Sequence, residues 1–298
     1  MLSLHTNSSA LSAQSSISRT QSALSTSQTR LSTGFRVNSA MDDAAGLQIA
    51  TRLKAQTSGM AVAMRNTQNS ISMLQTAEGA LDETTTILTR MKDLATQSAD
   101  ASSTTDDRTA LQAEFDALSN ELTNIVGNAS FGGTQLFKAT TGTLQSAVTF
   151  QIGASTDEKM TVSLNTALTT MTGSITAAAT GFKFDGTAGT AGTAAGGAAG
   201  TEIDGTNATT TIDKLKNAID SVGALRSQIG AVANRLDHVY NNLQNISTNT
   251  KAATGRIMDT DFAAESSNMT SSQMLLQAGT AMLKQSNSTS SLVMSLLQ

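Results

Sequence analysis

The chain has 298 residues and a formal net charge of −4, and its sequence holds no Pro, no Cys and no Trp. The lack of cysteine excludes disulfides and thiolate chemistry. Charged residues make up 14% of the chain, against about 25% in ordinary soluble domains, and they form no basic patch of the kind that binds nucleic acid. With aromatic residues at 3%, the core must be built from aliphatic residues and Met, which suits long helices packed side by side.

Residues 1–33 predict an amphipathic helix that is nearly free of charge. They are rich in Ser, Thr and Gln, and only two arginines carry charge. One heptad position is apolar throughout, at Ala10, Ile17, Leu24 and Leu31. Apolar residues at this spacing predict a helix that packs along a partner helix.

The stretch "LSTGFRVNSAMDDAAGLQIA" at 31–50 interrupts two helical patterns and predicts a joint. Gly34 would let the chain leave the first helix, Asn38 would tolerate unusual backbone angles, and Asp42 or Asp43 would start the next helix. A carboxylate pair can also hold a metal or transfer protons. No histidine accompanies this pair, and we therefore favour the capping interpretation.

Long heptad patterns predict the main helices of the chain. Residues 44–100 carry one apolar row at Met60, Leu74, Leu81, Leu88 and Ala95, with a second row beside it at Met73, Ala80, Ile87 and Leu94. A helix of this length spans roughly 85 Å and needs partners along its length. Residues 106–126, opened by Asp106 and Asp107, and residues 212–256 supply two further amphipathic helices.

The middle of the chain has a different pattern. "FGGTQLF" at 131–137 opens a region in which "AVTFQIGA" and "EKMTVSLN" alternate polar and apolar residues, so a β-hairpin or small sheet is predicted. "GTAGTAGTAAGGAAG" at 186–200 is of low complexity and predicts a surface loop or a minimal insert.

The C-terminal residues 266–298 repeat the pattern of the N-terminus. Lys284 is their one charged side chain, and Leu275, Met282 and Leu296 share a heptad position. Two nearly uncharged helices at opposite ends of one chain predict that they pair with each other. The lack of charge further predicts that both are enclosed in something larger, because an unpaired buried charge is costly.

Several motifs in order resemble those of bacterial flagellins. They are "RLSTGFRVNSAMDDAAGLQIA", "ISMLQTAEGALDE", "LTRMKDLATQSA", "SFGGTQLF", "GRIMDTDFAAESSNMT", "LLQAGTAMLKQSN" and the closing "SLLQ". The resemblance covers about residues 1–165 and 210–298. Residues 166–209 match nothing, as expected where flagellins vary, which implies a reduced variable outer region.

The resemblance implies a mainly α fold: a long antiparallel coiled-coil bundle of the N- and C-terminal regions, with a small β-hairpin and a short variable insert. Residues 1–43 and 260–298 would form inner-tube helices with their joints. Residues 44–165 and 210–259 would form the outer-tube bundle, and 166–209 the Gly/Ala/Thr-rich insert. The second joint, "GRIMDTDFAAE" at 255–265, would use Gly255, Asp259 and Asp261.

The function implied by the resemblance is that of an extracellular filament subunit that polymerises with copies of itself. It would be exported unfolded by the flagellar type III system, and the N-terminus indeed has no pattern of a secretory signal peptide. Its other partners would be the export chaperone and apparatus, the filament cap and the hook–filament junction proteins. Membrane insertion, nucleic-acid binding, catalysis, metal sites and cofactors are not expected, since His5 and His238 stand alone.

The resemblance also implies recognition of the monomer by the flagellin-sensing Toll-like receptor of hosts. In recognised flagellins an Arg, a Leu and a Glu on outer-tube helices dominate the contact, and the matching residues here are Arg90, Leu94 and Glu114. The other interpretation is that these side chains serve packing between subunits alone.

Two other functions stay open at this point. A hook–filament junction protein has similar ends and length, although "DDAAGLQIA" and "TAEGAL" favour flagellin. A secreted coiled-coil adhesin or an enzyme is the third hypothesis, and an adhesin would be expected to carry a signal peptide or a membrane anchor.

Overall fold

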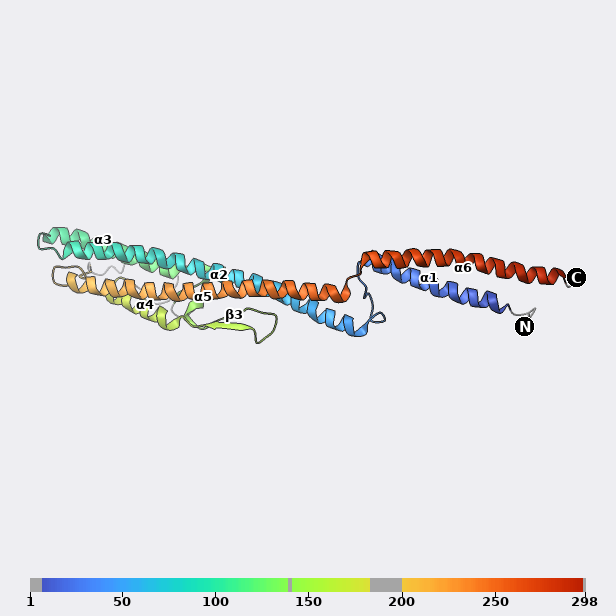
Figure 1. Ribbon diagram of the computed structural model, residues 1–298. Coiled ribbons are helices and arrows are strands. Elements are labelled where there is room, and N and C mark those ends of the chain that lie inside the picture. Colours follow the sequence, from blue (N-terminus) through green and yellow to red (C-terminus); the bar gives the residue numbers. More distant parts are fainter. Residues whose placement is uncertain (1–6, 139–140, 183–199, 297–298) are drawn as a thin grey trace. The chain divides into compact units, whose positions relative to one another are not determined.

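The computed structural model describes residues 7–138, 141–182 and 200–296, with side chains of the last helix described as far as Ser288. Its elements follow in the order α1 (Ser8–Thr33), α2 (Ala44–Ser98), α3 (Thr105–Asn128), β1 (Ser130–Phe131), β2 (Thr134–Gln135), η1 (Thr143–Gln145), β3 (Val148–Gln151), β4 (Lys159–Val162), α4 (Asn165–Ala178), α5 (Ala208–Met258) and α6 (Phe262–Leu296) (Figure 1). The mainly α fold with small antiparallel hairpins is confirmed.

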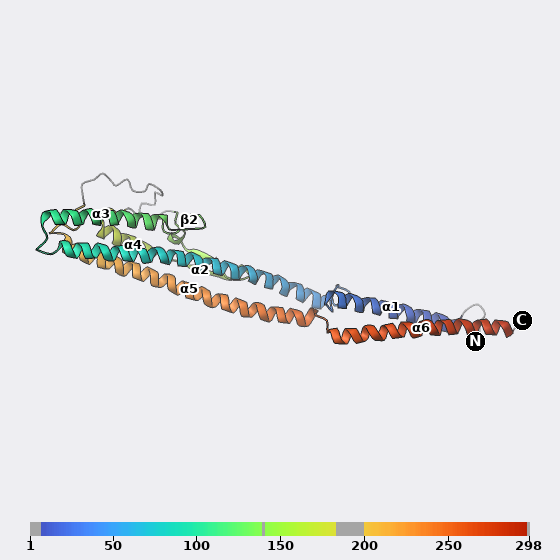
Figure 2. The same ribbon diagram turned by 90° about the horizontal axis from the view of Figure 1, so that it is seen from above.

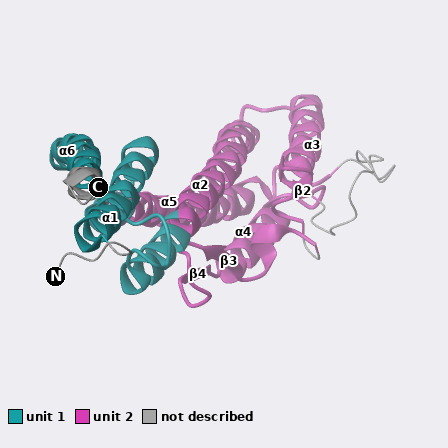
Figure 3. Ribbon diagram, turned by 90° about the vertical axis from the view of Figure 1, so that its right-hand side faces the viewer, with its two compact units in different colours: residues 1–57, 247–298 teal, residues 58–246 magenta. Residues whose placement is uncertain are grey.

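The chain divides into two compact units (Figure 3). The terminal unit comprises residues 1–57 and 247–298, and the central unit comprises residues 58–246. Both boundaries fall inside long helices, so α2 and α5 each contribute residues to both units. The assignment of residues to inner and outer tubes stays a prediction.

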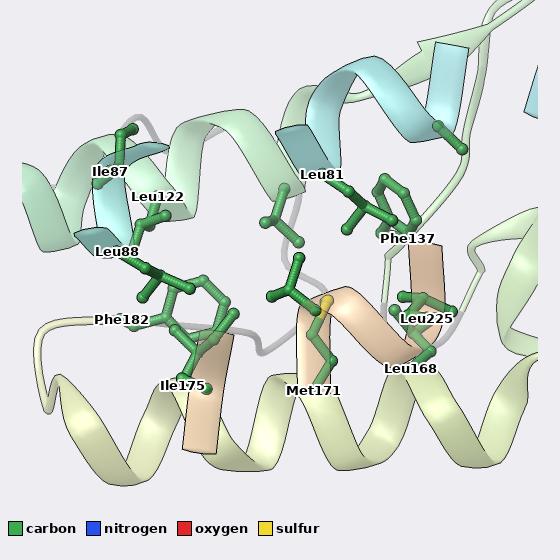
Figure 4. Packing of buried hydrophobic residues seen from close by; sticks show 14 of the residues in the cluster. Leu81, Ile87, Leu88, Leu122, Phe137, Leu168, Met171, Ile175, Phe182 and Leu225 are labelled. Carbon is green, nitrogen blue, oxygen red and sulfur yellow. The ribbon is translucent and has the colours of Figure 1, made fainter. Parts of the chain in front are cut away.

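One hydrophobic core holds the central unit together. Side chains of α2, α3, α4 and α5 converge in it, as Leu88, Leu122, Ile175 and Leu225 illustrate (Figure 4). Arg226 on α5 reinforces the antiparallel packing of α2 and α5, because its Nη1 lies 2.9 Å from Asp82 Oδ1. The core is aliphatic with few aromatic rings, as the composition predicted.

The start of α3 is fixed by a capping box. The Thr104 hydroxyl accepts a hydrogen bond from the Asp107 amide (3.2 Å), and Asp107 Oδ2 accepts from the Thr104 amide (3.0 Å). The N-cap is therefore Thr104, while the predicted Asp106 and Asp107 lie in the first turn. Hydrogen bonds from the Thr104 hydroxyl and amide hold the pKa of the Asp107 carboxyl below its usual value.

The region predicted to hold a β-hairpin or small sheet contains two hairpins. In β1–β2, Gly132 and Gly133 occupy the turn with φ of 58° and 84°, the left-handed angles that a tight two-residue hairpin turn requires. In β3–β4, Phe150 pairs with Met160, and both side chains are buried while their neighbours along each strand are not.

Helix α4 is an element that the sequence analysis did not predict. Leu168, Met171 and Ile175 follow the three-to-four spacing of a helix, and all three are buried in the main core (Figure 4). The helical pattern is hard to recognise in the sequence, because the exposed positions of α4 hold mainly Thr and Gly, which are poor helix formers. Packing of the apolar face outweighs this weak propensity.

A polar cluster joins the chain on both sides of residues 183–199, which lie outside the described residues. Glu202 accepts hydrogen bonds from the Thr180 amide (2.9 Å), the Thr180 hydroxyl and Gln112 Nε2 (2.8 Å). Gln112 Oε1 in turn accepts from the Ile203 amide (3.0 Å). We call Thr180, Gln112, Glu202 and Ile203 the Glu202 clasp. It anchors residues 180 and 202 to α3.

The charge of Glu202 is favoured inside this clasp. Burial raises the pKa of its carboxyl, but the hydrogen bonds from Thr180 and Gln112 outweigh burial and leave the pKa below its usual value. A carboxyl with a lowered folded-state pKa stabilises the fold above its unfolded-state pKa, and this contribution is lost as the pH falls through the folded-state value.

We expect Glu202→Gln to lower the free energy of unfolding by about 1–3 kcal/mol at neutral pH. The side-chain NH₂ group of Gln cannot accept the hydrogen bonds that one carboxylate oxygen of Glu202 accepts, so a donor of the clasp loses its partner. The difference from the wild type should shrink as the pH falls and the carboxyl protonates. Chemical denaturation across a pH series measures both effects.

Glu83→Gln is the matched control, since Glu83 is exposed on α2 and its loss should change stability by no more than about 0.5 kcal/mol. A Glu202→Gln effect as small as that of the control, or one that does not depend on pH, would contradict the clasp.

Candidate functional site

The ends of the chain pair as two antiparallel helices, α1 and α6, which lie side by side (Figures 1 and 2). Three contacts set the register. Asn7 Nδ2 donates to the Ser286 carbonyl (3.2 Å), Ile17 packs where Gly279 has no side chain, and Arg30 Nη1 lies 3.7 Å from Glu265 Oε2. A Cβ at residue 279 would lie 2.9 Å from Ile17 Cγ1, so glycine is required for this close approach.

The apolar heptad residues predicted on the two terminal helices, where the chain would assemble with copies of itself, separate into two groups. Ala10, Ile17, Leu24 and Leu31 are half-buried along one side of α1, in the row that contains the α6 contact of Ile17. Leu275 and Met282 are instead exposed, at 59% and 66%. The side chain of Leu296 lies outside the described residues.

Helix α6 presents three different faces. Its α1-facing side carries half-buried residues at heptad spacing, including Leu276 and Leu283, in line with Gly279. Roughly opposite lies an exposed apolar stripe, which we call the α6 stripe and which consists of Met274, Leu275, Ala278, Ala281 and Met282. A polar flank with Gln273, Gln277 and Lys284 separates the two on one side. The α6 stripe is therefore an apolar surface that α1 leaves uncovered.

Several hydroxyl groups on α1 form hydrogen bonds within their own helix. Five side chains donate to the carbonyl oxygen four residues earlier, at 2.9–3.1 Å: Thr20, Ser22, Thr26, Thr29 and Thr33. A hydroxyl with an internal acceptor loses less on removal from water than one that depends on solvent. The Ser/Thr-rich surface is thus suited to being covered by other protein.

The two joints lie against each other in the terminal unit. Gly34 ends α1 in the left-handed conformation (φ 74°), its amide donates to the Arg30 carbonyl (2.9 Å), and its own carbonyl accepts from the Thr260 amide (3.0 Å). Phe35 and Asp259 form an antiparallel β-bridge. Backbone hydrogen bonds therefore hold the chain where it leaves the terminal helix pair beside the point where it returns.

Two of the joint aspartates cap helices. Asp43 Oδ1 accepts from the Gly46 amide (2.8 Å) at the start of α2, and Asp261 Oδ1 accepts from the Ala263 amide (2.9 Å) at the start of α6. Asp42 instead organises the loop before α2. Its carboxylate accepts from the Ser39 amide (2.9 Å) and the Asn38 amide (3.1 Å), and these bonds hold its pKa below the usual value.

Asn38 and Gly255 differ from what the sequence suggested. Asn38 does not adopt a positive φ, because its amide is held by Asp42 and its side chain donates to the Phe35 carbonyl (2.8 Å). Gly255 lies within α5 and is not a turn residue. A Cβ there would lie 2.6 Å from Asp259 Oδ2, so Gly255 leaves room for that carboxylate.

The three residues matched to receptor contacts do not share one surface. Arg90 and Glu114 are exposed and form an ion pair between α2 and α3, with Arg90 Nη2 2.7 Å from Glu114 Oε1. Leu94 is 1% exposed and belongs to the main core. The expectation that Leu94 contacts a receptor is therefore corrected: it lies on the heptad row of Met73 and Ile87, which faces the core.

No group of three or more His, Cys, Asp or Glu side chains that could hold a metal occurs in the part of the chain that the structure describes. None of its described helices has an apolar stretch long enough to cross a membrane.

Comparisons with known proteins match both ends of the chain. Residues 4–142 match the family described as the bacterial flagellin N-terminal helical region, and residues 212–297 match the bacterial flagellin C-terminal helical region. Flagellin A of Vibrio anguillarum is 35% identical over 381 aligned positions that cover all of both chains. Flagellin D of the same organism is 45% identical over 164 residues, a match that covers 55% of this chain and 42% of that relative.

Comparison with solved structures gives two matches of different strength. The crystal structure of Bacillus cereus flagellin is 29% identical with a TM-score of 0.46, and the match covers 64% of this chain and 94% of that one. The structure of a putative flagellar hook-associated protein from Vibrio parahaemolyticus is 16% identical with a TM-score of 0.54, covering 73% and 100%. The second likeness concerns the fold alone.

The burial of Leu94 can be tested against the exposure of its neighbour. Leu94→Ala should lower the free energy of unfolding by about 2–5 kcal/mol, because it opens a cavity in the main core. Arg90→Ala should lower it by less than about 1 kcal/mol, because an exposed ion pair contributes little. Chemical denaturation compares the two variants, and equal effects would show that Leu94 is not a core residue.

Proposed function

The chain belongs to the family of bacterial flagellins, and we propose that it polymerises through its terminal helices as a structural subunit of the flagellar filament. The family is one of structural proteins and not of enzymes. The observation that carries the proposal is the α6 stripe, whose large side chains are about 60% exposed in the single chain. Copies of the same chain are the occupant that covers it.

The chemistry of the terminal helices supports enclosure by copies of the chain. From Ser266 onward α6 carries one charge, on Lys284 of the polar flank. Burial of an unpaired charge costs several kcal/mol, which a closed assembly avoids by having almost none. We propose that the α6 stripe packs against neighbouring subunits and that the polar flank faces the water-filled channel of the inner tube.

Folding and assembly are coupled in this proposal. The terminal pair buries little apolar surface by itself, so part of its order depends on neighbours. We propose that the chain is exported unfolded through the flagellar type III system, addressed by its N-terminal segment. The uncovered α6 stripe would serve as the docking surface of the export chaperone, which thereby blocks polymerisation in the cell. At the growing end the subunit would meet the filament cap, and at the base the hook–filament junction proteins.

The α6 stripe is tested by a pair of charge substitutions. Leu275→Glu should abolish polymerisation, because it places a carboxylate in a closed apolar contact. Gln277→Glu introduces the same charge on the polar flank and should leave polymerisation unchanged. Electron microscopy and sedimentation of the purified variants measure the polymer.

A chain that lacks residues 266–298 should likewise remain monomeric while the central unit keeps its helical circular dichroism. Filaments of normal length from Leu275→Glu or from the truncated chain would refute assembly through α6.

A hook–filament junction protein is the alternative within the same superfamily. The identity of 35% to Flagellin A over both complete chains favours the filament subunit. The two roles differ in copy number, since a filament needs many copies and a junction needs a short ring. Electron microscopy of the purified chain distinguishes long tubes with a central channel from short rings.

We also propose that the free monomer is recognised by the flagellin-sensing Toll-like receptor of hosts. Arg90 and Glu114 would supply the contact, since both are exposed and adjacent on α2 and α3. Leu94 would act indirectly, by packing α2 against the core beneath them. The same surface would be covered by neighbouring subunits in a filament.

Monomers should therefore activate the receptor, and cross-linked filaments at the same mass concentration should not, because the contact surface is covered. Receptor-reporter cells measure the difference. The double variant Arg90→Ala/Glu114→Ala should lose activation while it keeps its fold, since exposed ion pairs contribute little to stability. Equal activity from cross-linked filaments would contradict the proposal.

A further inference from the structure

The methionines whose side chains are described differ widely in exposure, and Met64, Met258 and Met269 are half-buried between the two extremes. Met41 is 97% exposed, Met282 is 66% and Met274 is 60%, and all three lie in the terminal unit. The methionines in the cores of the central unit are buried to 9% exposure or less: Met60, Met73, Met91, Met160 and Met171. The composition alone gives no hint of these differences.

From the exposure of Met274 and Met282 we infer that both are oxidation sites, and that hydrogen peroxide acting on the free subunit slows its polymerisation without unfolding it. The inference rests on the proposed polymerisation. In the reaction the methionine sulfur attacks the peroxide, the O–O bond breaks, an S–O bond forms, and water leaves. The sulfur is oxidised and the peroxide is reduced, and the product is methionine sulfoxide.

The position of the two residues determines the consequence. Met274 and Met282 stand at the two ends of the α6 stripe, with Leu275, Ala278 and Ala281 between them. A sulfoxide is polar and chiral, and no polar partner for it is present in the stripe itself. Covering it with a neighbouring subunit leaves a buried acceptor without a donor, which weakens the contact. The central core is spared, because its methionines are out of reach of the oxidant.

Peptide mass mapping tests the first step. Purified monomer is treated with hydrogen peroxide, and sulfoxide formation is followed at each methionine. Met41, Met274 and Met282 should react on the order of tenfold faster than Met60, Met91, Met160 and Met171, because oxidation follows exposure. The helical circular dichroism should not change. Equal rates at buried and exposed positions, or loss of helix at low peroxide, would overturn the inference.

Seeded elongation tests the second step. Oxidised monomer should extend short filament seeds roughly tenfold more slowly than untreated monomer, since each unpaired buried acceptor weakens the contact. Treatment with a methionine sulfoxide reductase should restore the rate. The variant M274L/M282L should elongate normally and resist peroxide, because Leu and Met are close in volume. The matched control M41L should stay sensitive, and resistance of M41L would overturn the assignment to α6.

The outcomes separate this inference from the proposed function. If untreated monomer never elongates seeds, the proposed function fails, whatever the peroxide chemistry. If untreated monomer elongates and peroxide has no effect, only the inference fails. If untreated M274L/M282L elongates poorly, the inference is tested instead with partly oxidised wild-type monomer, which is allowed to polymerise. Subunits left out of the polymer should be enriched in sulfoxide at residues 274 and 282, and equal content in both fractions would overturn the inference.

Discussion

The antiparallel pairing of α1 with α6 is the interaction on which the rest of the structure depends. It joins the first and last helices of the chain, and the β-bridge between Phe35 and Asp259 holds the exit from the pair beside the return. The chain between Phe35 and Asp259 must therefore run away from this bridge and return to it. Within the central unit α2 and α5 accordingly run antiparallel, as the contact of Arg226 with Asp82 and the packing of Leu243 near Met60 indicate. The pairing of the chain ends thus sets the topology of the long helices.

The two units differ in how they bury their apolar side chains. The central unit surrounds a continuous apolar core with four helices, and the Glu202 clasp ties residues 180 and 202 to α3. In the terminal unit α1 and α6 pack as a pair, and a pair of helices cannot bury all of its faces. The exposed faces of α1 and α6 carry few charges, and hydroxyl groups on α1 donate to carbonyl oxygens of the same helix. The central unit is complete within a single chain, whereas the terminal unit is suited to be completed by other copies of the chain.

Much of the fold could be predicted from the sequence, because heptad spacing survives wherever a helix packs along a partner. The long helices α2 and α5 are found within a few residues of the predicted limits. A β-hairpin or small sheet was also predicted from the alternating pattern that follows "FGGTQLF", and the glycines of this motif form the turn of the first hairpin. Helix α4 could not be predicted with the same ease, because its Thr-rich exposed face lowers helix propensity and only three-dimensional packing on the core stabilises it.

The candidate site was less predictable than the fold, because a resemblance transfers residue types and not their surroundings. Leu94 illustrates this point. Its type matched a receptor contact, yet its own heptad row already placed it with Ile87 on the core side of α2. Asn38 shows the same limit for the backbone, since a residue that tolerates left-handed angles does not adopt them when hydrogen bonds from its neighbours hold it elsewhere.

The exposed α6 stripe shows why heptad patterns alone do not identify a binding surface. Leu275 and Leu276 are adjacent in the sequence and belong to two equally regular heptad rows. The row of Leu276 faces α1, while the row of Leu275 stays exposed. Gly279 belongs to the row of Leu276, and a Cβ there would lie 2.9 Å from Ile17 Cγ1 on α1. Gly279 thus lies in the apolar row that packs on α1, and the row of Leu275 remains uncovered in the single chain.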